Sequence, residues 1–465
     1  MISKLLPLFC FLLFFSTSVS GQSAIVTDIS LKGNEKTKDF VILRELVVHE
    51  DSAYYICSQG NLFPLIERSK NRILNLNLFN KVDIITSEDS SSDGYTYYSL
   101  DIVVIEKWYA WPIPFVEFSD RNFNVWGNLN FDVERTNAGL YLFNYNLFGR
   151  NHTLKSKIKT GYNTELGVEY RIPFISRKSQ WGLKTIADYS SQDEIWYQTR
   201  NDSLQFYKNG EKDIRKRSLF SLELSKRITP YMRVFWEAQY EKNTINIDRD
   251  PISSRFQNID YNHVFSGSLS TEIDSRDNIY YPTSGSFISP KLTYFHLQDN
   301  QSVSNIKLEA RVQFFPKLGE KWSSAIALYG QTNTLRNLAY AKKRQLGYDD
   351  IVRGFEHYVV DGYQTLKGNV AFRYHLIHQS DLTLDFIPIK NYKVLPFNVY
   401  LETFVDAGRV YDETPHSSNT LVNSNLYSAG IGLNSLFYND RLLRLEYSLN
   451  SLKEGGFFVH FKKAI

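Results

Sequence analysis

Alternation of apolar and polar residues dominates the last three quarters of the chain. From Ile306 to Phe314 every even position is apolar, and every odd position between them carries a charge or an amide. Residues 443–450 also alternate between apolar and polar, and residues 154–160 do so with lysines on one side. Successive side chains of a strand point to opposite faces, so each stretch has one lipid-compatible face and one charged face. The pattern predicts antiparallel strands from Trp126 onward.

The spacing of turn residues divides this region into about sixteen strand segments, an even number as single-chain bacterial barrels require. We therefore predict an all-β membrane protein with a 16-stranded antiparallel transmembrane β-barrel over residues 126–465. A large soluble antiparallel sandwich is the alternative, but it would not need export, this length and so many aromatic residues together. The first four predicted segments are 127–134, 139–146, 151–161 and 164–172, and the last four are 397–406, 426–436, 442–449 and 456–462.

A mixed pattern precedes the barrel and predicts one small α+β domain over residues 22–107. A strand over 24–31 leads into helices over 37–46 and 62–76, whose apolar residues recur at helical spacing. A hairpin with arms 81–85 and 97–105 follows, with residues 87–94 as its polar loop. Residues 108–125 are interpreted as a linker.

The start of the chain predicts export. Lys4 precedes an apolar run from Leu5 to Phe15 and then small residues up to Gly21, as in a secretory signal peptide over residues 1–21. The run is too short for a membrane anchor, which needs about 20 apolar residues. After cleavage only Cys57 remains, so no internal disulfide can form.

The amino-acid composition favours an outer-membrane location and gives no sign of a nucleic-acid partner. Mean hydropathy is −0.33, yet aromatic residues reach 15%, as the interfacial girdles of an outer-membrane barrel require. The net charge of +3 comes from interleaved acidic and basic residues, which gives nucleic-acid binding no support. We expect the barrel in a Gram-negative outer membrane and the small domain in the periplasm.

Val352, Arg353, Gly354 and Phe355 stand out in the longest predicted loop, residues 333–362. An arginine flanked by apolar residues and glycine needs a buried acidic partner or a solvated lumen. A loop of this length is typical of a functional segment rather than a plain connection.

Several short motifs, in order along nearly the whole mature chain, resemble the outer-membrane assembly and translocation superfamily. This superfamily includes BamA, TamA, the mitochondrial sorting barrel and the two-partner secretion transporters. The small domain resembles a polypeptide-transport-associated (POTRA) domain. The matching segments are Ile29–Asn34, with Gly33 and Asn34; Ile42–Leu46, with Arg44; Asp274–Asn278, with Arg276 and Asp277; Pro282–Gly285; Val352–Phe355; and Phe404–Gly408.

The resemblance implies that Arg353 lies on a loop folded into the lumen and pairs with Asp406. Alternation supports this pairing, because Asp406 shares parity with Glu402 while Val405 lies on the other face. The alternative is a solvated loop arginine and an unrelated lumenal aspartate. We call Val352, Arg353, Gly354, Phe355 and Asp406 the lumenal latch.

The resemblance also implies a weakly joined seam between the first and last barrel strands, here 127–134 and 456–462. Gly455 and Gly456 would permit a bend there, although an ordinary turn explains them equally well. The chain does not end on the aromatic residue usual in the family. We therefore expect Phe457, Val459 and Phe461 to carry the recognition of this barrel by its own assembly machinery.

The function predicted from these features is outer-membrane protein assembly or polypeptide translocation, through a gated seam and periplasmic strand capture. A passive or gated diffusion or secretion pore is the alternative. No G-x-S-x-G motif occurs and the nine histidines form no metal-ligand or triad spacing, so we expect no catalytic residues, metal or cofactor. The expected partners are outer-membrane lipids, extended client polypeptides and accessory envelope proteins.

Overall fold

The computed structural model describes residues 22–56, 62–92, 94–118, 133–208, 210, 212–246, 260–299, 302–385 and 393–463. The expected signal peptide, Cys57 and most of the expected first barrel strand, 127–134, lie outside the described residues.

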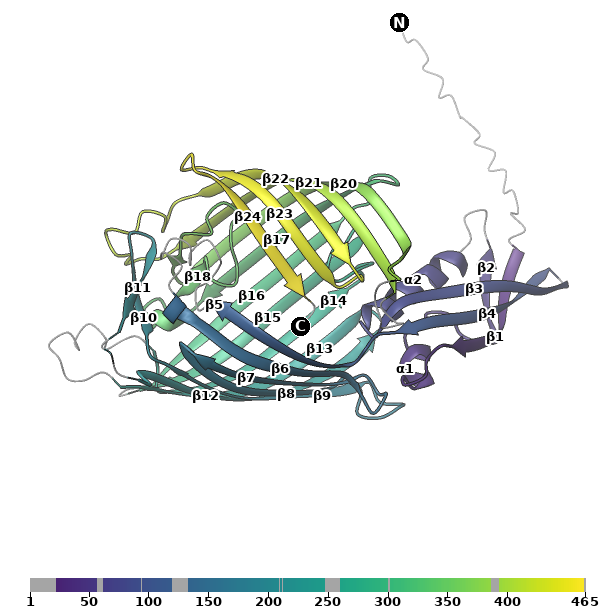
Figure 1. Cartoon of the computed structure of the whole chain (residues 1–465), viewed down its shortest axis with the longest axis horizontal. Helices are drawn as coiled ribbons and strands as arrows, with labels where there is room; N and C mark the ends of the chain where they lie inside the picture. Colours follow the sequence, from purple (N-terminus) through teal and green to yellow (C-terminus); the bar gives the residue numbers. More distant parts are fainter. Residues whose placement is uncertain are drawn as a thin grey trace, which may run out of the picture.

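One antiparallel sheet of 16 strands forms the larger part of the molecule and curves into a barrel (Figure 1). The predicted fold class and strand number are confirmed. Consecutive strands are neighbours throughout, apart from two short hairpins that the order skips. The strands are β5 (Ala110–Phe118), β6 (Thr136–Leu147), β7 (His152–Gly161), β8 (Asn163–Ile172), β9 (Trp181–Gln192), β12 (Arg215–Thr229), β13 (Met232–Ile245), β14 (His263–Asp274), β15 (Gly285–Gln298), β16 (Ser302–Phe315), β17 (Trp322–Asn333), β20 (Gln364–Thr383), β21 (Val394–Tyr411), β22 (Leu426–Phe437), β23 (Arg441–Asn450) and β24 (Gly455–Lys463).

The barrel begins earlier in the chain than its pattern indicated. Residues 108–125 were expected as a linker, but they contain β5, the first strand of the sheet, and Val133–Arg135 form a 3-10 turn, η1. Pro112 and Pro114 hid this strand, because a proline has no N–H for a sheet ladder. At the edge of a sheet this loss is tolerated, and β5 still pairs with β6 over nine residues.

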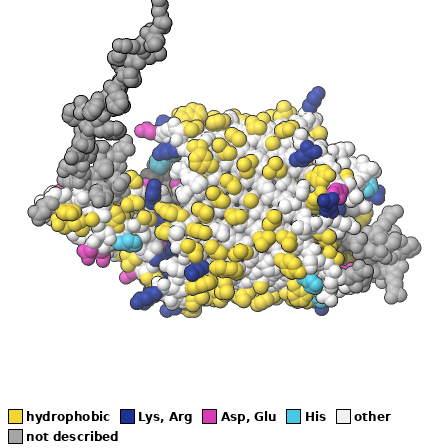
Figure 2. Space-filling view, turned by 180° about the vertical axis from the view of Figure 1, so that it is seen from behind, with side chains coloured by type: hydrophobic (Ala, Val, Ile, Leu, Met, Phe, Trp, Pro, Cys, Tyr) yellow, Lys and Arg dark blue, Asp and Glu magenta, His cyan; other side chains and the backbone are white. Residues whose placement is uncertain are grey.

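The outer wall is apolar, as a lipid-facing surface requires. On β21, Leu401 and Val405 are exposed, whereas Glu402 and Asp406 point inward and are 2% and 4% exposed. Figure 2 shows the wall from behind, with hydrophobic side chains across it and charged ones mainly towards its two ends. None of the helices in the described segments has the length and apolar character to cross a bilayer.

Two short hairpins lie at the end of the barrel away from the N-terminal domain. Strands β10 (Ile195–Arg200) and β11 (Ser203–Tyr207) extend the connection between β9 and β12. Strands β18 (Arg344–Leu346) and β19 (Val360–Asp361) lie with the 3-10 turn η3 (Tyr340–Lys342) in the long connection between β17 and β20. We call residues 334–363 the inner loop, since most of them are buried or half-buried.

The N-terminal domain is a four-stranded sheet covered by two helices. Its elements are β1 (Gln22–Lys32), α1 (Asp39–Leu43), β2 (Ser52–Ile56), α2 (Leu62–Asn75), β3 (Phe79–Ser92) and β4 (Tyr95–Glu106). The strand order is β2-β1-β4-β3, with β1 parallel to β4 and the other pairs antiparallel. Val41, Ile42, Ile73, Ile102 and Val104 form part of its core.

Three local expectations for this domain were wrong. The first helix is only α1, because the backbone tightens into turns after Leu43. The short strand β2 was missed, since five residues at a sheet edge carry little alternation. The expected polar loop 87–94 mostly continues the strands, with Ser87 paired to Ser99, because the backbone ladder forms whatever the side-chain polarity.

Candidate functional site

Inside the barrel the inner loop brings the Val352–Phe355 motif against the strands next to the seam. Val352 and Phe355 are 2% and 4% exposed and pack with Leu346, Val360 and Val410 in one apolar cluster. These contacts fix the loop, so the Arg353 side chain between them has a defined direction.

Glycines on both sides of the contact allow the close approach. Gly354 has φ +83°, a left-handed conformation, and Asn450 Nδ2 on β23 donates to its carbonyl at 2.8 Å. A Cβ on Gly408 of β21 would lie 2.6 Å from Val352 Cγ2, so glycine at this position leaves room for the inner loop to pack against β21.

Arg353 is 8% exposed and binds three carboxylates. Its Nε and Nη2 donate to the two oxygens of Asp406 at 2.9 and 2.8 Å, and its backbone N–H donates to the same carboxylate at 3.2 Å. Its Nη1 donates to Glu402 at 2.9 Å and to Glu446 at 3.1 Å. The guanidinium carbon lies 3.4 Å from the ring centre of Phe404. The structure therefore places the proposed pair, Arg353 and Asp406, in direct bidentate contact.

Two further arginines complete a cluster that the sequence interpretation missed. Arg373 Nε donates to Glu402 at 2.6 Å, and Arg444 Nη2 donates to Glu446. Glu402 and Glu446 are each 2% exposed. We define the latch cluster as these three arginines and three carboxylates: Arg353, Arg373, Arg444, Glu402, Asp406 and Glu446. Equal numbers of opposite charges allow them to be buried together. Alternation had put Glu402, Arg444 and Glu446 on the lumenal face, but only the strand register shows that they meet.

The matching segments Asp274–Asn278 and Pro282–Gly285 form the turn between β14 and β15. Asp274 binds the Arg276 guanidinium through two bonds of 2.8 and 2.6 Å. Asp277 accepts the backbone N–H groups of Thr283 and Ser284 at 2.9 and 3.1 Å, which closes the turn. Gly285 has φ +97°, and a Cβ there would lie 2.3 Å from a backbone oxygen. These residues shape the turn.

This turn connects the N-terminal domain to the latch cluster. Asn75, the last residue of α2, donates to the carbonyls of Arg276 and Asp277 at 3.3 and 3.2 Å. From the same turn, Tyr281 donates its hydroxyl to Glu402 at 3.3 Å, and the Pro282 carbonyl accepts from Arg373 at 2.6 Å. One turn of backbone thus separates the domain from the buried charges.

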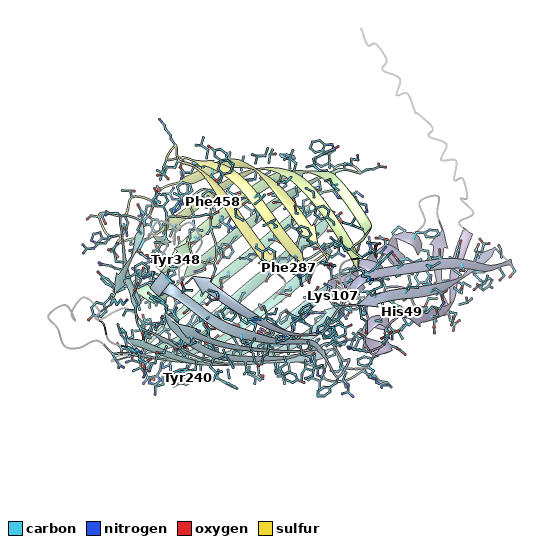
Figure 3. The ribbon with its side chains drawn as sticks, in the orientation of Figure 1. His49, Lys107, Tyr240, Phe287, Tyr348 and Phe458 are labelled. Carbon is cyan, nitrogen blue, oxygen red and sulfur yellow. The ribbon has the colours of Figure 1, made fainter. Side chains whose placement is uncertain are left out.

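At the seam, no pairing joins β5 to β24 in the part of the chain that the structure describes. Phe457, Val459 and Phe461 point outward and are 64–80% exposed, and Gly455 and Gly456 begin β24. The inward residues of β24 contact the inner loop instead. His460 Nε2 lies 3.0 Å from Glu356 Oε1, and the Phe458 ring lies 6.2 Å from that of His357. Figure 3 marks Phe458 on this last strand.

The three residues predicted as sites in the N-terminal domain, Gly33, Asn34 and Arg44, each make a structural contact. Gly33, with φ +91°, passes so close to the Val104 carbonyl that no side chain fits. The Asn34 amide donates to Asp39 at 2.7 Å at the start of α1. Arg44 contacts the barrel, where its guanidinium lies 3.1 Å from the Phe174 ring centre and donates to the Ser179 carbonyl at 2.9 Å.

Across the described segments, no group of three or more histidine, cysteine or acidic side chains is arranged to hold a metal ion. The charged side chains of the lumen are instead mostly paired with one another. The latch cluster lines a cavity of about 480 Å³ that also contains Arg311, Lys367 and Asp350. The latch cluster holds the inner loop against β21 and β23 through these buried ion pairs.

These features define an outer-membrane β-barrel with an inner loop anchored by a buried arginine. The Omp85 superfamily domain matches residues 146–437, which is more than half of the chain, and the chain belongs to this superfamily. It is an outer-membrane protein of the Gram-negative type. The superfamily that the short motifs indicated is therefore confirmed.

Solved structures of the same fold agree. CdiB from Escherichia coli aligns with a TM-score of 0.56 and 12% identity, over 94% of this chain and 75% of that chain. BamA from Haemophilus ducreyi lacking POTRA domains 1–3 aligns with a TM-score of 0.50 and 15% identity, over 94% of this chain and 83% of that one. At these identities the likeness concerns the fold alone. No curated protein sequence matches the chain.

Proposed function

We propose that this protein assembles proteins into the outer membrane or translocates polypeptides across it, by opening the seam between β5 and β24. The observation that carries the proposal is that β24 has no strand partner on its seam side among the described residues, while its inward side chains contact the inner loop. On its other side β24 pairs with β23, so the seam can open at its free edge without breaking that ladder.

The latch cluster sets the position of that loop. Glu356, which contacts His460 on β24, lies three residues after Arg353, so movement of the loop carries the contact on β24 with it. An unpaired strand exposes N–H and C=O groups that can template an incoming client strand. In this mechanism the latch is a positioning device, and the backbone edge of the seam acts on the client.

The N-terminal domain supplies a second place for strand capture. Its sheet ends at β2 on one side and at β3 on the other, and both edges are free of strand partners in the described part of the domain. An extended client could add to either edge through backbone hydrogen bonds. The domain contacts the barrel at several points, among them a 3.0 Å ion pair of Lys107 with Asp440, so a captured segment would lie near the barrel mouth.

A gated pore is the second candidate, and closure of the far end of the lumen bears on it. Asp202, at the β10–β11 turn, is 4% exposed and accepts the backbone N–H groups of Thr420 and Leu421 at 3.0 and 3.1 Å. Its carbonyl accepts from Val359 of the inner loop at 2.9 Å. We infer that this anchored hairpin would have to move before a pore conducts, which favours a gated pore over passive diffusion.

The test is a reversible tether between the inner loop and the seam strand. In a Cys57→Ser background, Glu356→Cys and His460→Cys are joined by a short cross-linker that contains a disulfide. Ser268→Cys with Thr293→Cys, a directly paired lumenal couple on β14 and β15, is the matched control. The readout is the amount of folded outer-membrane proteins, or of secreted protein, in cells that depend on this chain.

We expect the loop-to-seam tether to block function and reduction to restore it, while the control tether leaves function intact. Full activity with the tether closed would refute the seam mechanism. Rapid swelling of liposomes that contain the unmodified protein would instead favour a constitutive pore.

A further inference from the structure

A second ionic cluster lies where the N-terminal domain meets the barrel, and its charges do not balance. At its centre, Glu45 is 3% exposed and accepts from Arg72 at 2.6 Å and from Arg227 at 2.9 and 2.5 Å. Arg72 belongs to α2 of the domain and Arg227 to β12 of the barrel. A single buried carboxylate therefore already binds two arginines.

Three more arginines face the same region. Arg233 on β13 is the direct cross-strand partner of Arg227, which puts two like charges opposite each other. Glu272 on β14 is the other cross-strand neighbour of Arg233. Arg44 and Arg171 interact electrostatically with Arg233. Around this junction five arginines thus meet two carboxylates, Glu45 and Glu272, because the nearby Asp274 and Glu223 are paired with Arg276 and Lys184.

Some of the arginine N–H groups in this cluster are buried without a hydrogen-bond acceptor in the described part of the chain. Arg44 Nε and Nη1 and Arg227 Nε are fully buried and have no hydrogen-bond partner among the described residues. Both guanidinium groups stack on Phe174, at 3.1 and 5.4 Å, but stacking covers the face of the group and leaves its edge donors unused. Burial, and secondly the charge of Arg227, lowers the pKa of Arg44 to about 10. Buried N–H groups of this kind show that the junction holds more positive charge than its own carboxylates satisfy.

A cavity of about 330 Å³ lies beside this cluster, which we call the junction cavity. Arg171 and Arg233 line it, together with Phe174, Asn75 and Tyr280. Lys155 and Glu169, which also line it, form an ion pair with each other at 3.2 Å, so the two arginines dominate its charge. Its volume is at the lower end of the range of roughly 300–1,000 Å³ typical of ligand pockets.

The orientation of these arginines identifies the source of the anion. Arg227 and Arg233 are on the lumenal face of their strands, whereas Lys226 and Trp236 are on the outer face. A lipid headgroup at the outer surface would be on the wrong side of the wall. A polypeptide that passes from the domain into the lumen would reach the junction cavity, and its carboxylates are acceptors that arginine binds well.

We infer that the junction cavity binds carboxylate side chains of an acidic client segment, with Arg233 and Arg171 as the contacting residues. This inference rests on the proposed function, because it names the chemistry of the client at the entrance to the lumen. Glu45 holds Arg72 and Arg227 in place beside the cavity, and the client carboxylates offset the excess positive charge at Arg233 and Arg171.

The test measures binding of a rhodamine-labelled hexaglutamate peptide to the full-length protein in detergent by fluorescence anisotropy. Hexaglutamine of the same length is the neutral probe. Arg233→Gln removes one of the two positive charges of the cavity that have no ion pair among the described residues, and Lys226→Gln removes an outer-face charge next to Arg227 as the matched control. We expect hexaglutamate to bind and hexaglutamine not to bind. Arg233→Gln should weaken the affinity for hexaglutamate by at least about tenfold, while Lys226→Gln should leave that affinity unchanged. Gel mobility before and after heating verifies that each barrel is folded, and Arg171→Gln replaces Arg233→Gln if that variant does not fold.

Equal binding of the two peptides, or unchanged affinity in the folded arginine variant, would overturn the inference. So would binding of inorganic phosphate without binding of the peptide, which would assign the cavity to a small oxyanion. The cross-linking experiment between the inner loop and β24 tests the proposed function independently of this binding measurement. A protein that the tether inactivates but that ignores hexaglutamate keeps its proposed function and loses this site.

Discussion

Removal of the Arg353 side chain is the most direct perturbation of the latch cluster. Arg353→Ala breaks four side-chain hydrogen bonds and leaves Asp406, Glu402 and Glu446 with only two arginines. Removing one partner from a buried ion pair leaves the other charge uncompensated, so we expect a loss of about 3–5 kcal/mol in the free energy of unfolding. The membrane-facing wall is untouched, so the variant should still integrate into the membrane.

Asp406→Ala should cost less, about 2–3 kcal/mol, because Arg353 keeps Glu402 and Glu446 as acceptors. The double variant should then resemble Arg353→Ala, since the second change removes only the bonds of Asp406 with the backbone N–H of residue 353 and with Asn369, together with a carboxylate already left without its arginine. The assay is chemical unfolding of the purified barrel in micelles, followed by tryptophan fluorescence. Outer-membrane protein levels in cells that depend on the variant give the functional readout.

Additive losses in the double variant would refute the reasoning, because they would mean that the two residues act independently. Arg311→Ala is the matched control. This lumenal arginine binds Asp350 at 3.2 Å but is 45% exposed, so its removal should cost less than about 1 kcal/mol.

Three further predictions follow from the same geometry. Gly354→Ala should destabilise the inner loop by about 1–2 kcal/mol, because φ +83° and the Ser448 hydroxyl 3.1 Å away both oppose a Cβ, and unfolding midpoints should measure it. Asn75→Ala removes the side-chain bonds from α2 to the β14–β15 turn, so limited proteolysis should release the N-terminal domain sooner while the barrel stays resistant. Glu45→Ala leaves Arg227 and its neighbours without their central carboxylate and should loosen the domain by about 3–5 kcal/mol, which hydrogen exchange in α2 would detect.

Much of the barrel was predictable, because alternation with a period of two is a local property of each strand. It put Asp406 and Glu402 on the lumenal face, where the structure has them. It failed at β5, where Pro112 and Pro114 break the expected composition of a strand. It also failed at β2, a strand too short to show a period.

The site was only partly predictable, because it depends on contacts between distant segments. Arg353 and Asp406 came from a motif and a parity argument. Arg373 needed the register that joins β20 to β21, which puts it directly opposite Glu402. Glu446 lies on β23, which is separated from β21 by β22, and no local sequence pattern shows that residues of these two strands meet. The junction cluster was missed for the same reason, since Arg44 and Arg227 meet only after the domain docks.

The two prolines of β5 have a consequence for how molecules of this protein behave towards each other. The ladder with β6 is continuous, so the nitrogens of Pro112 and Pro114 face the open side of the strand, where they present no hydrogen to donate. Another copy that approaches edge to edge meets fewer donors there than an ordinary strand would offer. The barrel can thus keep an unpaired edge strand in a crowded membrane without pairing edge to edge with neighbouring copies.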